Sequence, residues 1–250
     1  ELSGQGANVV IADLNKELGQ KVADDLSLSS RGKVVCFSCD VADYESVEKM
    51  VSEVYLTFGQ IDVFISNAGI LRAGTIEEMD PSTFELITKI NYQGYFNCVK
   101  AVTPVMKKQY KADNKRYMDI IQVNSKSGLK GSNKNFAYAG GKFGGLGLTQ
   151  SFALELMPFN IKVNSICPGN FFEGPLWADP ETGLFKQYLD TGKVPGAKTL
   201  EDVKAYYEKQ VPAGRGCRVK DVVKAINYAI EQEYETGQAI PVTGGQIMLK

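Results

Sequence analysis

The protein has 250 residues, a formal net charge of −1 at pH 7 and no histidine. This length suits one globular domain, and the near-zero charge argues against a whole-chain field that would attract nucleic acid or anionic lipid. Without histidine, neither a Ser-His-Asp triad nor a His-ligated metal site can form. The start of the chain lacks the layout of a signal peptide, and no apolar run approaches the roughly 18 residues of a membrane span. We therefore expect a cytoplasmic protein that holds no metal and binds neither nucleic acid nor a membrane.

Short apolar runs alternate with longer amphipathic runs along the whole chain. This rhythm, with nearly continuous apolar strands, predicts a Rossmann-type α/β fold: a doubly wound parallel sheet in a single domain, residues 1–250. The predicted strands are 7–14, 33–41, 61–69, 117–125, 161–169 and 238–245. The predicted helices are 15–29, 43–59, 81 to about 109, 137–156 and 220–233.

One region, residues 170–219, interrupts this rhythm. It contains no predicted strand, several Gly and Pro residues, and two short amphipathic pieces at 183–189 and 200–211. Long excursions within a compact domain are commonly functional. The segment is predicted to be a helical substrate lid.

Cys36 and Cys39 form a C-x-x-C pattern, which can mark a redox or metal pair. Here it falls on a predicted strand, where residues three apart point to opposite faces. We expect both cysteines to be packed side chains.

In open α/β sheets, ligands bind at the carboxyl ends of the strands. These ends are predicted to carry Asp13, Asp40, Asn67-Ala68-Gly69, Ser125 and Pro168-Gly169. The Asp13 carboxylate could accept hydrogen bonds from both ribose hydroxyls of NAD and would repel the 2′-phosphate of NADP. The alternative for Asp13 is an ordinary helix N-cap.

A glycine-rich phosphate loop would be expected about 20 residues before such an acid, which places it before Glu1. The "SGQG" of residues 3–6 precedes a predicted strand instead of following one. We therefore expect the first strand of the fold and its glycine-rich loop to lie before Glu1.

Tyr138 and Lys142 are four residues apart on a predicted helix, so they share one face. A nearby ammonium favours the phenolate and is expected to pull the pKa of the tyrosine down from about 10. Such a tyrosine could take a proton from an alcohol while hydride leaves its carbon. Ser125, at the end of a strand, could hold the developing alkoxide. The alternative is a surface Tyr–Lys pair.

Together, Ser125, Tyr138 and Lys142, with "NAG" at 67–69, "DV" at 40–41 and "PG" at 168–169, resemble the short-chain dehydrogenase/reductase family over the whole chain. The resemblance implies an oxidoreductase, commonly a homotetramer. It implies that Asn91 holds a water in a proton relay to Lys142. It also implies that Asp40 and Val41 border the adenine, and that Asn67 and Gly69 lie at the ribose. The family's T-G-x-x-x-G-x-G loop is absent, and Glu173 stands where members commonly carry a carboxamide-binding Thr.

A closer likeness points to family members that act on a polyol phosphate. It is carried by "VNSKSG" at 123–128, "KFGGLGLTQSFALEL" at 142–156, "VPAGRGC" at 211–217 and "TGGQIML" at 243–249. It implies NAD-linked interconversion of D-sorbitol 6-phosphate and D-fructose 6-phosphate. Lys126, beside Ser125, and Arg215 are the candidate phosphate ligands. For Lys126 the alternative is a solvated surface charge. The open alternatives for function are a dehydrogenase of another polyol, a steroid or an acyl thioester, and a nucleotide-binding module without catalysis.

Overall fold

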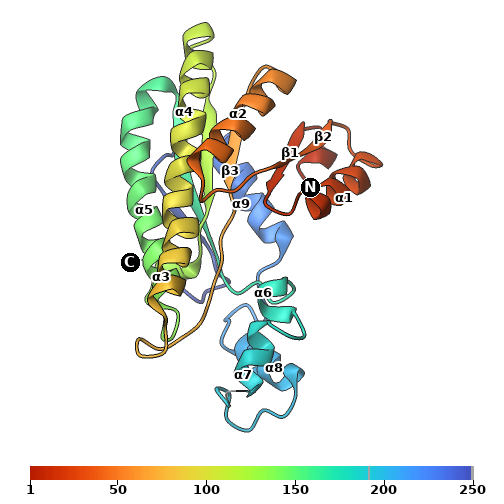
Figure 1. Cartoon of the computed structure of the whole chain (residues 1–250), viewed down its shortest axis with the longest axis vertical. Coiled ribbons are helices and arrows are strands. Elements are labelled where there is room, and N and C mark those ends of the chain that lie inside the picture. Colours follow the sequence, from red (N-terminus) through yellow and green to blue (C-terminus); the bar gives the residue numbers. More distant parts are fainter. Residues whose placement is uncertain (191, 249–250) are drawn as a thin grey trace.

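The structure is a computed structural model that describes residues 1–190 and 192–248 (Figure 1). Thr191, in the predicted lid, and Leu249, in the carboxy-terminal motif, lie outside the described residues. Within the described part, no helix is both long enough and apolar enough to span a membrane.

All strands pair in parallel, as predicted, but they form two sheets. β1 (Val9–Asp13) pairs with β2 (Val34–Ser38), whereas the larger sheet has the order β3-β4-β5-β6. The strands of the larger sheet are β3 (Val63–Ser66), β4 (Met118–Val123), β5 (Ile161–Pro168) and β6 (Ala239–Val242). The α/β prediction is confirmed, and each predicted strand contains an observed one.

Helices cover both faces of the larger sheet. On one face, α2 (Tyr44–Phe58), α4 (Gly94–Ala112) and α5 (Phe136–Leu156) enclose the main core, in which Val47, Val102 and Ile120 are fully buried. On the other face, α9 (Val219–Glu231) packs against β4, β5 and β6. α1 (Lys16–Ser27) packs against the small sheet, at the right of Figure 1.

The predicted helix from Pro81 to about Gln109 is divided. α3 (Pro81–Thr88) is followed by one π-helical stretch, η2 (Lys89–Gln93), and then by α4. A π-helical turn inside a helix frequently marks a functional site. Here it contains Asn91, which is buried.

A cavity of about 570 Å³ lies between the two sheets. Both β1 and β3 line it along their length, because each pairs with only one neighbour among the described residues. Four of the predicted cofactor residues also line it: Asp13, Val41, Asn67 and Ala68.

After β5 the chain enters the segment predicted to be a lid, drawn at the bottom of Figure 1. Its helices are α6 (Pro175–Ala178), α7 (Leu184–Asp190) and α8 (Leu200–Lys209), and the last two match the predicted amphipathic pieces. The segment has an apolar cluster of its own, in which Phe172, Trp177 and Phe185 are buried with ring centroids 5.0–5.6 Å apart. It therefore packs as a distinct layer beside the sheet.

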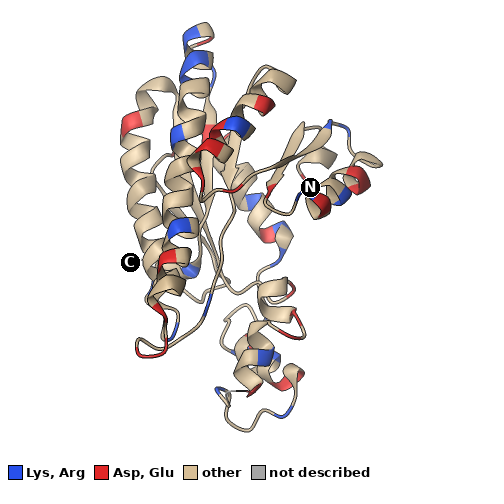
Figure 2. Ribbon diagram, in the orientation of Figure 1, with Lys and Arg blue, Asp and Glu red and all other residues tan. Residues whose placement is uncertain are grey.

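Cys36 and Cys39 contribute to different apolar clusters, Cys36 under α1 and Cys39 in the main core, and both thiols are free. Both cysteines are packed, as predicted, although only Cys36 lies on a strand and Cys39 directly follows β2. Lysine, arginine and acidic residues are interspersed on the same helices in Figure 2.

Candidate active site

Ser125 and Tyr138 come together where β4 ends and α5 begins. Ser125 follows β4 in extended conformation and starts a short 3-10 turn, η3 (Lys126–Gly128), where its Oγ accepts a hydrogen bond of 3.1 Å from the Ser127 N–H. Tyr138 lies in the first turn of α5, and its phenol lies close enough to the Ser125 side chain for Ser125 to affect its pKa. The structure thus places the two residues that the sequence singled out beside each other.

The pKa of Tyr138 is raised above its ordinary value. The prediction that this pKa is lowered is therefore wrong for the protein without a bound cofactor. Burial is the largest cause; the neighbouring Ser125 side chain lowers the pKa of Tyr138 but does not outweigh burial. The Lys142 Nζ lies 5.6 Å from the centroid of the tyrosine ring. A phenolate at this position therefore needs more positive charge than Lys142 alone provides.

Lys142, one turn further along α5, is buried. Its Nζ donates a 2.8 Å hydrogen bond to the Val123 carbonyl at the end of β4. Burial lowers the pKa of Lys142 to about 8, and the nearby Cys167 thiol acts weakly in the opposite direction. Near neutral pH the ammonium form therefore dominates.

Asn91 joins the same site from the π-helical stretch. Its amide is anchored to the backbone of Ile70, since Oδ1 accepts from the Ile70 N–H and Nδ2 donates to the Ile70 carbonyl, both at 2.8 Å. A Cβ on Gly69 would lie 3.2 Å from Asn91 Oδ1 and 3.8 Å from Lys142 Nζ. Gly69 thus connects Asn91 to Lys142, and Lys142 in turn lies near Tyr138, the neighbour of Ser125.

Asp13 ends β1 at the rim of the cavity and is exposed. The N-cap of α1 is Asn15, so the N-cap alternative for Asp13 is wrong. Its Oδ1 accepts a 2.8 Å hydrogen bond from the Asn15 N–H. Among the described residues this carboxylate makes no other hydrogen bond, so acceptor positions remain for a ligand.

The remaining predicted cofactor residues lie at the ends of their strands. The Asp40 Oδ1 accepts from the Ala42 N–H at 2.9 Å, and the Val41 carbonyl accepts from Asn97 Nδ2 at 2.9 Å. Pro168 ends β5, and the Gly169 N–H donates to the Val242 carbonyl at 2.9 Å.

The two substrate candidates differ in their surroundings. Lys126 is half-buried, and burial, then the charge of Lys130, lowers its pKa. The Arg215 guanidinium is held by the Asp221 carboxylate through two bonds of 2.6 and 3.0 Å. Glu173 is exposed, 4.0 Å from the Arg218 guanidinium. Lys126 is thus the cation of the two that carries no carboxylate partner among the described residues.

Two residues near the site were not predicted. Asn124 is bonded to the backbones of Ser125 and Lys142. Cys167 is fully buried, close enough to Lys142 and Tyr138 to affect the pKa of each. The position of Asn124 before Ser125 was visible in the sequence, but its bonding partners were not.

The family assignment follows from this site and from a direct comparison. The model of the short chain dehydrogenase family matches residues 1–177. The chain belongs to the short-chain dehydrogenase/reductase family, whose members are oxidoreductases that bind a nicotinamide cofactor.

Sorbitol-6-phosphate 2-dehydrogenase of Escherichia coli strain K12 is 33% identical over 99% of this chain and 92% of its own. The crystal structure of sorbitol-6-phosphate 2-dehydrogenase from Erwinia amylovora has a TM-score of 0.90 at 36% identity, covering 99% of this chain and 93% of its own. NAD⁺-bound xylitol dehydrogenase has a TM-score of 0.85 at 27% identity, covering 98% and 91%.

The residues present fit the adenosine ribose of such a cofactor. The exposed Asp13 carboxylate ends β1 and makes one hydrogen bond among the described residues, which leaves acceptor positions for ribose hydroxyls. The "SGQG" segment forms a 3-10 turn, η1 (Ser3–Gln5), that precedes β1, as predicted. It is therefore not a phosphate loop of the strand–loop–helix kind.

Proposed function

We propose that the protein catalyses the NAD-dependent interconversion of D-sorbitol 6-phosphate and D-fructose 6-phosphate. The observation that carries the proposal is the Ser125–Tyr138–Lys142 arrangement with a half-buried lysine, Lys126, directly after the serine. The 33–36% identity to two sorbitol-6-phosphate 2-dehydrogenases supports the choice of substrate.

In the oxidative direction, Tyr138 takes the proton of the C2 hydroxyl while Ser125 holds the same oxygen. The cofactor, when bound, accepts the hydride from C2. The Lys142 ammonium, held by the Val123 carbonyl, stabilises the phenolate, and Asn91 fixes the chain around Gly69 beside it. In the reverse direction the neutral tyrosine returns the proton.

NAD is favoured over NADP because of Asp13. A carboxylate accepts bonds from ribose hydroxyls and repels a 2′-phosphate. The segment after Asp13 reads "LNKELG" and contains no arginine that could bind the 2′-phosphate of NADP.

The assembly we propose is a homotetramer built on α4 and α5. Phe96, Phe143 and Leu154 on these helices are 42%, 46% and 83% exposed, which suits burial against another copy. Light scattering of the purified protein gives its mass directly.

We also propose a cytoplasmic location, which agrees with five free cysteines.

The proposal is tested by following NADH formation with sorbitol 6-phosphate and, separately, with sorbitol. We expect kcat/KM to favour the ester by about 10²-fold, since a buried charge-assisted contact contributes roughly 1.5–3 kcal/mol. Tyr138→Phe is expected to lower kcat by about 10²–10⁴-fold with NADH still bound. Equal turnover of both substrates would contradict the proposal that the substrate is a phosphate ester. A fully active Tyr138→Phe variant would contradict the proposed role of Tyr138 in catalysis.

A further inference from the structure

Asn124 connects two proposed catalytic residues that belong to different elements. It directly follows β4, and only 4% of its surface is exposed. Its Oδ1 accepts from the Ser125 N–H at 2.8 Å, and its Nδ2 donates to the Lys142 carbonyl at 2.9 Å. One amide therefore ties the strand end that carries the serine to the helix that carries the tyrosine and lysine.

A buried hydrogen-bond network fixes the orientation of the Asn124 amide. The second Nδ2 hydrogen of Asn124 goes to Gln122 Oε1 at 2.8 Å, and the same oxygen accepts from Ser165 Oγ at 3.0 Å. Ser165 Oγ lies 2.7 Å from Thr149 Oγ1, which lies 3.1 Å from the Tyr95 hydroxyl. This buried network extends from β4 through β5 and α5 to α4. Flipping the Asn124 amide would place oxygen against oxygen at Gln122 and at Lys142.

Two glycines leave the space that these amides occupy. A Cβ on Gly128 would lie 2.3 Å from Asn124 Oδ1 and 3.0 Å from the Lys142 carbonyl oxygen. A Cβ on Gly145 would lie 2.5 Å from Gln122 Nε2. Real Cβ atoms essentially never show contacts under 3.0 Å, so a side chain at either position would force the Asn124 or Gln122 amide out of its observed place.

We propose that Asn124 is a positioning residue of the active site, whose buried amide sets the distance between Ser125, just after β4, and the Tyr138–Lys142 pair on α5. The proposal rests on the function proposed above. Displacements of about 1 Å in a reacting group can cost about 10²-fold in rate. The tether therefore acts on the proton transfer through Ser125 and Lys142, without touching the substrate.

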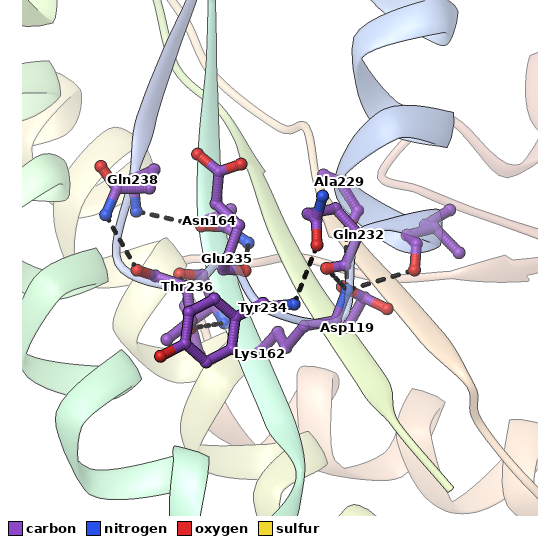
Figure 3. Close-up of polar contacts among 11 residues, drawn as sticks. Asp119, Lys162, Asn164, Ala229, Gln232, Tyr234, Glu235, Thr236 and Gln238 are labelled. Carbon is purple, nitrogen blue, oxygen red and sulfur yellow. Dashed lines mark hydrogen bonds and ion pairs between the residues drawn. The ribbon is translucent and has the colours of Figure 1, made fainter.

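The test compares Asn124→Ala with a matched control, Asn164→Ala. Asn164 lies on the adjacent strand β5 and is fully buried, but its amide faces the other way: it donates to the Glu235 carbonyl and accepts from the Gln238 N–H (Figure 3). Both variants lose a buried, bonded amide, so both are expected to lower the melting temperature. Only Asn124→Ala is expected to lower kcat, by about 10–10²-fold, with NADH affinity changed less than about threefold.

The pH profile separates positioning from general destabilisation. The Ser125 hydroxyl lowers the pKa of Tyr138. Moving Ser125 away removes that contribution, so the pKa of the tyrosine rises further. Alcohol oxidation needs the phenolate, so the acid limb of kcat/KM is expected to move to higher pH in Asn124→Ala and to stay in place in Asn164→Ala.

The experiment distinguishes failure of the positioning role from failure of the proposed function. If Tyr138→Phe is inactive while Asn124→Ala and Asn164→Ala share the wild-type pH limb and the same small loss of kcat, the positioning role is wrong and the function stands. If Tyr138→Phe keeps full activity, the proposed function itself is wrong, and the positioning role with it. A lower kcat and a shifted limb in Asn124→Ala alone support the proposal.

Discussion

Lys126 and Lys130 show how residues of one type on one loop acquire different roles. Lys126 is half-buried beside Ser125, and burial, with the charge of Lys130, lowers its pKa, whereas Lys130 is exposed. A partly desolvated ammonium gains more from a dianionic phosphate than a solvated one, because the effective dielectric constant around it is lower. The same loop thus supplies both a candidate ligand and its control.

Lys126→Ala is expected to raise KM for sorbitol 6-phosphate by about 10–10²-fold, the value of one charge-assisted bond. KM for any unphosphorylated polyol that the enzyme accepts should change little. Lys130→Ala, an exposed charge of the same sign, is expected to change KM for the ester by at most about fivefold. Steady-state kinetics with both substrates decide the point. Equal effects of the two variants would assign the phosphate to another cation.

At the scale of an element, one buried lysine adds polar contacts between the sheet and the end of α9, beside their apolar packing. Lys162, on β5, is fully buried, and its Nζ donates to the carbonyls of Ala229, Ile230 and Gln232 at the end of α9 (Figure 3). The same Nζ lies 3.0 Å from Asp119 Oδ1 on β4. Burial raises the pKa of Asp119 to about 6, and Lys162 only partly opposes this. A cation at the carboxyl end of a helix also complements its macrodipole.

Lys162→Met is expected to lower the free energy of unfolding by about 3–5 kcal/mol, because it leaves a buried carboxylate and helix-end carbonyls without their donor. Urea unfolding at pH 7.5 measures the loss. The control is Lys204→Met, which removes an exposed i,i+4 pair with Glu208 at 4.0 Å; a change of about 0.3–0.5 kcal/mol is expected. Similar losses in the two variants would show that the buried pair contributes no more than a surface pair.

At the scale of the whole molecule, the segment 170–219 has an apolar cluster separate from the main core. Trp177 is 7% exposed and packs edge-on against Phe172, Tyr188 and Tyr207. Burial raises the pKa of Tyr188, and the side chain of Asn135, in the loop that leads into α5, lies close enough to oppose this in part. Separate clusters can open as separate cooperative units. We therefore expect the proposed lid to open without loss of the sheet.

Trp177→Ala is expected to destabilise this cluster by about 3–5 kcal/mol, as for other buried aromatic truncations. Hydrogen exchange should then rise across 170–219 while β4 and β5 keep their protection, and KM for the substrate should rise. Tyr234→Ala, at a fully exposed ring, serves as the unperturbed reference. Uniform loss of protection over the whole chain would show that the lid and the sheet form one cooperative unit.

Local pattern in the sequence was enough to predict each strand, the helical pieces of the lid, and Ser125, Tyr138 and Lys142 as one site, whereas Asn91 was predicted from the family resemblance alone. Strand and helix periodicities depend only on residues that are close in sequence. In a parallel sheet the carboxyl ends of the strands lie at one edge, so residues at those ends are expected to lie close together. The opposed packing of Cys36 and Cys39 followed from the same alternation.

Other features depended on contacts between distant segments, and the tertiary structure alone decided them. The pKa of Tyr138 rises because burial outweighs the help of its neighbours, and no spacing in the sequence measures burial. Arg215 is bonded to Asp221, and Asn124 owes its partners to the close approach of β4 and α5. The sequence by itself determined which elements form and which residues could do chemistry. The tertiary structure decided which of those side chains are free, buried or held, because desolvation and hydrogen-bond geometry exist only once the elements pack.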